Sequence, residues 1–112
     1  MKLRVTLLCA VLAGCTSPGK LKEEAPVLRL QANHSPSVYM TCLLPKWQEL
    51  RASAAVQEIR LGYRLIMPSG SGDTAEALLE TTAVDKGSDI ALYRRNPPSA
   101  DDAITRAVRS CL

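Results

Sequence analysis

Residues 55–67 read AVQEIRLGYRLIM. Apolar or aromatic side chains alternate with mainly charged ones along most of this stretch. Successive side chains of a β-strand point to opposite faces, so this period of two predicts one continuous strand with one buried face. The residues expected on one side are Gln57, Ile59, Leu61, Tyr63, Leu65 and Met67. The next residues, 68–73 (PSGSGD), combine proline, glycine and serine and predict a turn after this strand.

Two further strands are expected downstream. Residues 74–84 are ambiguous, because Asp73 and Glu76 have the spacing of a helix capping box while the segment ends in stiff β-branched residues. Residues 85–88 (DKGS) are a good hairpin turn. We therefore interpret residues 77–84 as a second strand, with a helix as the alternative, and residues 89–95 as a third.

A helix is expected on each side of these strands. Ser35 and Pro36 form a helix start, and the pattern that follows predicts a helix over residues 36–52, kinked or split by Pro45. Ser99, with Asp102 three residues later, indicates the start of a C-terminal helix. The predicted fold is therefore α+β, in the order α-β-β-β-α. It has a three-stranded antiparallel sheet with two helices packed on one face.

The N-terminus has the layout of a secretory signal. Lys2 and Arg4 precede an apolar run, and the small residues Ala13 and Gly14 precede Cys15. The tetrad Leu12-Ala13-Gly14-Cys15 resembles the lipobox of bacterial lipoproteins.

That resemblance implies that residues 1–14 are a signal peptide and that Cys15 carries the lipid. It also implies anchoring to a membrane by acyl chains such as palmitate. Thr16 follows the cysteine in place of the aspartate that retains enteric lipoproteins in the inner membrane. By this resemblance the protein is lipid-anchored in the cell envelope, at the outer membrane and facing the periplasm.

Residues 15–34 are expected to be the lipidated cysteine and a flexible tether, because this segment holds prolines, a glycine and a mixed-charge run. Residues 27–30 alternate briefly, so an edge strand is an alternative there. Residues 35–112 are expected to form the small α+β domain in the periplasm.

Composition excludes several classes of protein. The 112-residue chain has a formal charge of +3 and 46% hydrophobic residues, which argues against a disordered polyelectrolyte. Without residues 1–14 the chain loses two of its 14 basic residues and none of its 11 acidic ones, so the charge falls to +1. A charge so close to zero argues against nucleic-acid binding. No stretch of the sequence approaches the roughly 20 apolar residues that span a bilayer.

Two cysteines, Cys42 and Cys111, remain after the signal and the lipidation site are assigned. In an exported chain such a pair most simply forms a disulfide, here between the two predicted helices. Two buried free thiols are the alternative. No metal site is expected, because two cysteines and one distant histidine do not make a zinc set.

No residue pattern indicates a catalytic centre or a cofactor. His34 lies beside the tether, where a histidine is more often solvated than catalytic. Arg60 and Arg64 share a strand face and would meet Arg94 if the strands pair, which gives either a salt-linked surface or a contact for an anionic partner. Trp47 is either a core residue or an exposed contact residue.

We therefore expect a non-catalytic, lipid-anchored envelope protein whose disulfide-clipped domain binds another envelope protein or an anionic envelope component. An exposed strand edge is a reasonable means of binding. The alternative is a periplasmic inhibitor or immunity protein that acts against a toxin or hydrolase.

Overall fold

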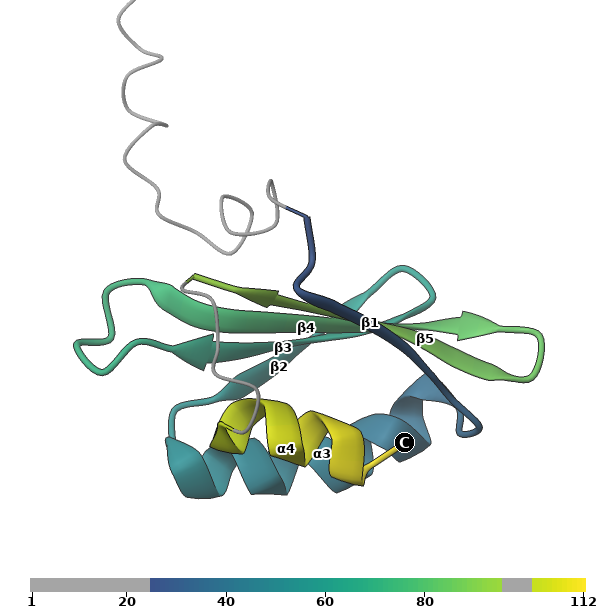
Figure 1. The fold of residues 1–112 in the computed structure, drawn as a ribbon, viewed down its shortest axis with the longest axis horizontal. Coiled ribbons are helices and arrows are strands. Elements are labelled where there is room, and N and C mark those ends of the chain that lie inside the picture. The colour runs from purple at the N-terminus through teal and green to yellow at the C-terminus, as the bar shows by residue number, and fades with distance from the viewer. Residues whose placement is uncertain (1–24, 96–101) are drawn as a thin grey trace, which may run out of the picture.

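One antiparallel sheet covered on one face by two helices makes up the fold of the computed structural model, which describes residues 25–95 and 102–112 (Figure 1). In chain order the elements are β1 (Leu28–Ala32), α3 (Pro36–Leu50), β2 (Ala55–Ile59), β3 (Gly62–Pro68), β4 (Ala75–Val84), β5 (Gly87–Arg94) and α4 (Ala103–Ser110). The strands lie in the order β1-β5-β4-β3-β2. The predicted α+β class is confirmed, but the sheet has five strands and not three.

The predicted strand over residues 55–67 is in fact a hairpin. Arg60 and Leu61 form a turn between β2 and β3, and Ile59 pairs with Gly62 across it. The prediction of one strand was wrong because the two-residue turn exchanges the two faces. Gln57 is opposite Arg64 and so lies on the face away from the core, whereas Leu65 lies toward it. Only the second half of the predicted face, Tyr63, Leu65 and Met67, turns toward the helices.

The fifth strand comes from the segment that we assigned to the tether. Residues 28–32 form β1, which pairs with β5 in the register Leu28 to Leu92 through Ala32 to Ser88. The folded domain therefore begins before residue 35, and the alternative of an edge strand here was correct. Gly87 allows β1 to lie this close, because a Cβ at residue 87 would lie 2.0 Å from the carbonyl oxygen of Ala32.

The interpretation of residues 77–84 as a strand is confirmed, since β4 runs through them and pairs with β3 on one side and β5 on the other. One irregularity interrupts the pairing of β3 with β4. Met67 is opposite Ala77 and the next residue, Pro68, is opposite Ala75, so Glu76 is an extra residue on β4. Such a bulge redirects the side chain that it inserts, here next to Arg51 and Arg94.

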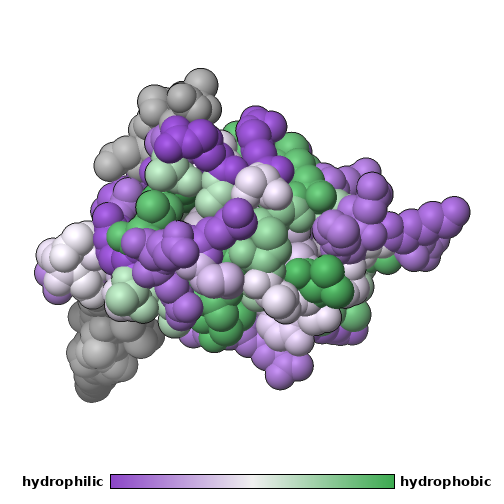
Figure 2. Space-filling model, turned by 90° about the horizontal axis from the view of Figure 1, so that it is seen from below, coloured by the Kyte–Doolittle hydropathy of each residue, from purple (hydrophilic) through white to green (hydrophobic). Residues whose placement is uncertain are grey.

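The core lies between the sheet and the two helices. Its buried members include Tyr39, Leu43 and Trp47 from α3 and Ile104 and Val108 from α4. The sheet residues that pack against them are Leu65, Met67, Ala77, Leu79, Ile90 and Leu92. Figure 2 shows the molecule from the helix side, where polar and apolar side chains are interspersed.

Helix α3 is continuous through Pro45, so the helix is not split there, and of the two predicted effects of Pro45 the split is wrong. Ser35 is the N-cap as expected, and its hydroxyl accepts a hydrogen bond from Val38 N at 3.3 Å. Proline removes the hydrogen bond to the carbonyl four residues earlier, that of Thr41. Both Pro45 and Thr41 are exposed, so water can solvate that carbonyl and the helix continues.

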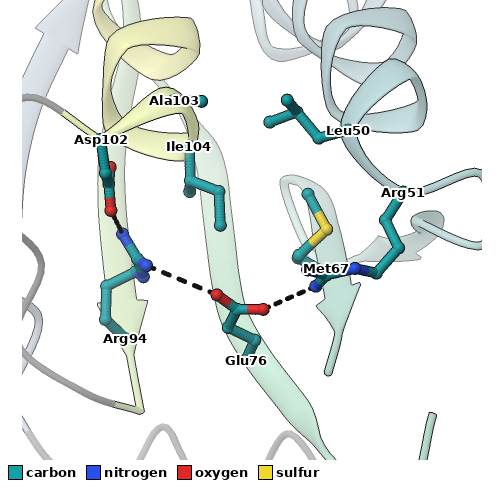
Figure 3. A pocket seen from close by; sticks show the side chains of 8 residues that line it. All are labelled: Leu50, Arg51, Met67, Glu76, Arg94, Asp102, Ala103 and Ile104. Atoms are coloured by element: carbon teal, nitrogen blue, oxygen red, sulfur yellow. Dashed lines mark hydrogen bonds and ion pairs between the residues drawn. The ribbon is translucent and has the colours of Figure 1, made fainter. Parts of the chain in front are cut away.

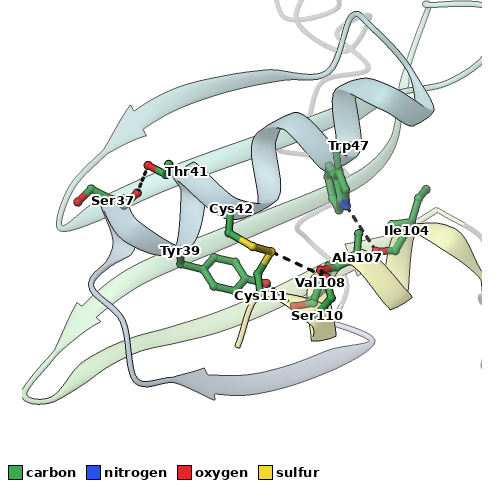
Figure 4. The surroundings of a disulfide bond; sticks show 10 residues. All are labelled: Ser37, Tyr39, Thr41, Cys42, Trp47, Ile104, Ala107, Val108, Ser110 and Cys111. Carbon is green, nitrogen blue, oxygen red and sulfur yellow. Dashed lines mark hydrogen bonds between the residues drawn. A yellow bond between two sulfur atoms is a disulfide. The ribbon is translucent and has the colours of Figure 1, made fainter.

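The predicted disulfide is confirmed. Cys42 of α3 and Cys111 at the end of α4 are bonded, with their Cα atoms 5.8 Å apart (Figure 4). The N-cap of α4 is Asp102, whose carboxylate accepts a hydrogen bond from Thr105 N at 2.8 Å. Ser99, which we expected at this helix start, lies outside the described residues.

Candidate functional site

Trp47 is a core residue, so its role as a partner contact is excluded. Its side chain is fully buried between α3 and α4, and its indole Nε1 lies 3.4 Å from the carbonyl oxygen of Ile104, to which it donates (Figure 4). A buried indole of this kind fills space in the core and has its polar atom satisfied.

Arg94 is also largely buried. Its side chain, only 7% exposed, donates to Asp102 Oδ2 and lies 3.7 Å from Glu76 Oε2. The other carboxylate oxygen of Glu76 accepts from Arg51 at 2.6 Å, so the four side chains form one chain of ion pairs (Figure 3). They line a pocket of about 280 Å³ together with apolar residues such as Met67.

This ion-pair chain is electrically balanced, with two guanidinium groups and two carboxylates. Burial acts to raise the pKa of Asp102, but hydrogen bonds from Arg94 and Thr105 outweigh it and hold the pKa below its ordinary value. Asp102 is therefore ionised at neutral pH. Its carboxylate caps α4 and, through the ion pair with Arg94, joins that helix to β5. The role of Asp102 is therefore structural.

The three arginines that we expected to meet do not form one cluster. Arg64 lies on the sheet face away from the helices, where it donates to Glu80 at 2.8 and 3.0 Å. Arg94 lies on the helix face, since its register partner Ala77 packs in the core. Arg60 is exposed in the β2–β3 turn. The salt-linked interpretation is thus correct for Arg64, and of these three arginines Arg60 is the one with an exposed side chain.

The feature that remains is the free edge of the sheet at β2. Within the described ranges, β3 is the only strand that pairs with β2. Residues 55–58 are exposed and Ile59 is half-buried, so no side chain of β2 is in the core. An edge strand of this kind offers unpaired backbone N–H and C=O groups to another chain.

The hydrogen-bond pattern shows which groups are unpaired. Ala83 N donates to Leu61 O at 2.8 Å, so the carbonyl of Leu61 points toward β4. Along β3, successive residues direct their N–H and C=O groups alternately toward β4 and toward β2. The β3 residues that bond β2 are thus Gly62, Arg64 and Ile66, opposite Ile59, Gln57 and Ala55. The N–H and C=O groups of Val56 and Glu58 therefore point outward from the sheet.

The turn beside this edge holds an unusual residue. Leu61 has φ of 69° and is 66% exposed, the largest exposure among the large hydrophobic side chains of the described residues. A leucine in the left-handed region costs about 1–2 kcal/mol, and such strain is often kept at functional sites. Gly62 follows because a Cβ there would lie 1.9 Å from Thr81 O, so the glycine has a structural reason.

Comparison with known proteins gives no family for the chain: no protein-family model, curated protein or solved structure matches it. The assignment of a site therefore depends on geometry. The surface that geometry selects, which we call the β2 edge, comprises the backbone of Val56 and Glu58 with the side chains of Arg60 and Leu61.

Sequence analysis did not identify Val56, Glu58 or Leu61 as site residues. The only available signal was Gly62, a residue common in turns, and it was read as part of a longer strand. Cys15 and the rest of the lipobox lie outside the described residues, so the lipidation site stays a prediction.

Residues 25–95 and 102–112 contain no cluster of histidine, cysteine, aspartate and glutamate that could hold a metal ion. Their helices are too short or too polar to cross a bilayer.

Proposed function

We propose that the protein is a non-catalytic, lipid-anchored envelope protein whose domain binds a partner by strand addition at the β2 edge. An extended segment of the partner would lie beside β2 and continue the sheet. Main-chain hydrogen bonds then supply affinity, and neighbouring side chains supply specificity. The observation that carries the proposal is that, among the residues the structure describes, β3 alone pairs with β2, and residues 55–58 of β2 are exposed.

The residues around this edge favour a particular kind of segment. Leu61 offers an exposed apolar side chain that a partner can cover. Arg60 places a positive charge at the same turn, which favours an acidic residue in the partner. The partner segment is thus expected to be extended, with an apolar site and a carboxylate near its contact with the turn.

The rest of the molecule supports a binding role through its rigidity. The disulfide, the Tyr39 hydrogen bond to Val108 O at 2.8 Å and the Arg94–Asp102 ion pair fix the two helices to each other and to the sheet. A rigid sheet presents an edge without a large ordering cost on binding. The lipobox resemblance of residues 12–15 supports anchoring.

The test is affinity capture after crosslinking in cells that produce the full tagged chain. Val56→Pro removes an outward N–H without removing a bond between β2 and β3, a position where edge strands tolerate proline. Arg29→Pro is the matched control, because the same alternation places the Arg29 N–H outward on β1, the opposite edge. We expect the partner to be lost with Val56→Pro and kept with Arg29→Pro.

A partner that both variants retain would exclude the β2 edge. Cys15→Ser tests the anchor in the same assay. A partner lost with this variant places binding in an anchored complex, whereas a partner kept would favour a freely acting inhibitor and contradict the anchored complex.

A further inference from the structure

The β2 edge has few of the features that usually keep a free strand from pairing with its own kind. Proteins protect such edges with short strands, charged side chains (lysine above all), proline or a bulge. The strand sequence AVQEI contains neither residue, and its pairing with β3 is regular from Ala55 to Ile59. Glu58 is its one charged residue. With this one charge and its short length as its only protection, the strand makes a second copy of the same chain a physical candidate for the edge.

The outward backbone groups limit the ways in which two copies can pair in antiparallel fashion. Only outward residues can exchange hydrogen bonds, so Val56 and Glu58 of one copy must face Val56 or Glu58 of the other. A register with Val56 opposite itself places Glu58 opposite Ala54. That residue cannot form a bonded pair, since its N–H already donates to Arg51 O at 2.9 Å, and its carbonyl already accepts from Gln48 at 3.2 Å.

A register with Glu58 opposite itself brings two carboxylates together and is unfavourable. The remaining register places Val56 of each copy opposite Glu58 of the other. Both outward residues then form bonded pairs, no like charges are directly opposite, and the two-fold axis passes between the two Gln57 residues.

We propose that the chain forms a homodimer through this register, in which two β2 strands join the sheets of two copies into one. The strand is short, so the pairing is weak in dilute solution. Confinement of both copies to one membrane raises their effective concentration. In that respect the inference rests on the proposed lipid anchor. It also deepens the proposed use of the β2 edge by naming a second copy as an occupant that competes with other partners.

The register makes a sharp prediction about position 57. The two Gln57 residues face each other as a non-hydrogen-bonded pair, in which Cα atoms of neighbouring strands lie about 4.5 Å apart. That distance is within the range for a disulfide. Ala55 is exposed on the same side of the sheet, but the register pairs it with Ile59 of the other copy and not with itself.

The experiment compares Gln57→Cys with the control Ala55→Cys in full chains produced in a bacterial envelope and treated with copper–phenanthroline as oxidant. We expect a covalent dimer with Gln57→Cys and none with Ala55→Cys. Adding Val56→Pro to Gln57→Cys should abolish that dimer, whereas adding Arg29→Pro should leave it unchanged. Retention of the Cys42–Cys111 bond, checked by non-reducing mass spectrometry, shows that each variant has folded.

Equal crosslinking of both cysteine variants, or of neither, would overturn the homodimer. That result is distinguishable from failure of the proposed function, which is judged by loss of the captured partner with Val56→Pro. A Gln57→Cys chain that does not dimerise, together with a partner lost with Val56→Pro, leaves strand addition in place and removes only the second copy.

Discussion

Cys42 and Cys111 are separated by 69 residues and form one disulfide that joins α3 to α4 on the same face of the sheet. The bond lies beside two other links between these helices, from Tyr39 to Val108 O and from Trp47 to Ile104 O (Figure 4). Helix α4 is short, so its position depends on these links and on the Asp102 ion pair at its start.

Replacing both cysteines, by Cys42→Ala and Cys111→Ala together, should lower the free energy of unfolding by roughly 4 kcal/mol. The reason is that a closed loop of this length restricts the unfolded chain. Urea denaturation of the purified protein measures the loss. Wild-type protein treated with a reductant is the control and should unfold at the same urea concentration as the double variant. A difference of less than about 1 kcal/mol between oxidised and reduced protein would contradict the argument.

Tyr39→Phe should destabilise the protein by about 1–2 kcal/mol, because the buried carbonyl of Val108 loses its donor. Burial also raises the pKa of the Tyr39 hydroxyl. The associated stability is full below the unfolded pKa of about 10 and is lost as pH rises above it. Denaturation at pH 8 and pH 11 should therefore show a smaller alkaline loss for Tyr39→Phe than for wild type. Tyr63→Phe, at a half-buried position, is the control and should keep the wild-type response.

Asp102→Asn should remove part of the acid sensitivity of the fold. The folded-state pKa of Asp102 lies below its ordinary value of 3.8, so its contribution to stability is present above that pH and is lost as pH falls through the folded pKa. Asparagine keeps the helix cap but not the ion pair with Arg94, at a cost of about 1–3 kcal/mol near pH 7.

Denaturation at pH 7 and pH 3 checks this, with Asp85→Asn in an exposed turn as the control. If the stability difference between Asp102→Asn and wild type stays the same at both pH values, the carboxylate does not make the proposed contribution.

Features that depend on neighbours in sequence were predictable, and features that depend on the third dimension were not. The Ser35 cap, the strand at residues 77–84 and the Cys42–Cys111 pair follow from local pattern or from the number of cysteines. The β2–β3 turn was missed because Leu61 adopts a backbone conformation that leucine rarely takes. Strand β1 was assigned to the tether because a short alternating segment is stabilised as a strand only by its pairing with β5.

In the candidate site too, the residue types were predictable from the sequence, but their positions were not. The arginines were visible in the sequence, but which of them is exposed depends on sheet register. Register places Arg64 opposite Glu80 and turns Arg94 toward Asp102. An unpaired edge is a property of strand order, which no local pattern of β2 encodes.

Leu61→Gly should make the domain more stable and its binding weaker. Glycine adopts a φ of 69° without the steric cost that leucine has there, so the free energy of unfolding should rise by about 1 kcal/mol. The same change removes the most exposed large apolar side chain of the β2 edge, so a partner that covers it should be captured less. Urea denaturation measures the first effect, and capture after crosslinking in cells measures the second.

Val27→Ala is the control, because Val27 is a 43% exposed apolar residue beside β1, at the opposite edge of the sheet from β2. It should leave capture unchanged, which separates a specific contact at Leu61 from a general loss of apolar surface. A Leu61→Gly protein that is more stable and still captures its partner fully would show that the strain serves no binding role. Opposite changes in stability and capture would instead mean that the strained turn is kept because binding requires the leucine side chain.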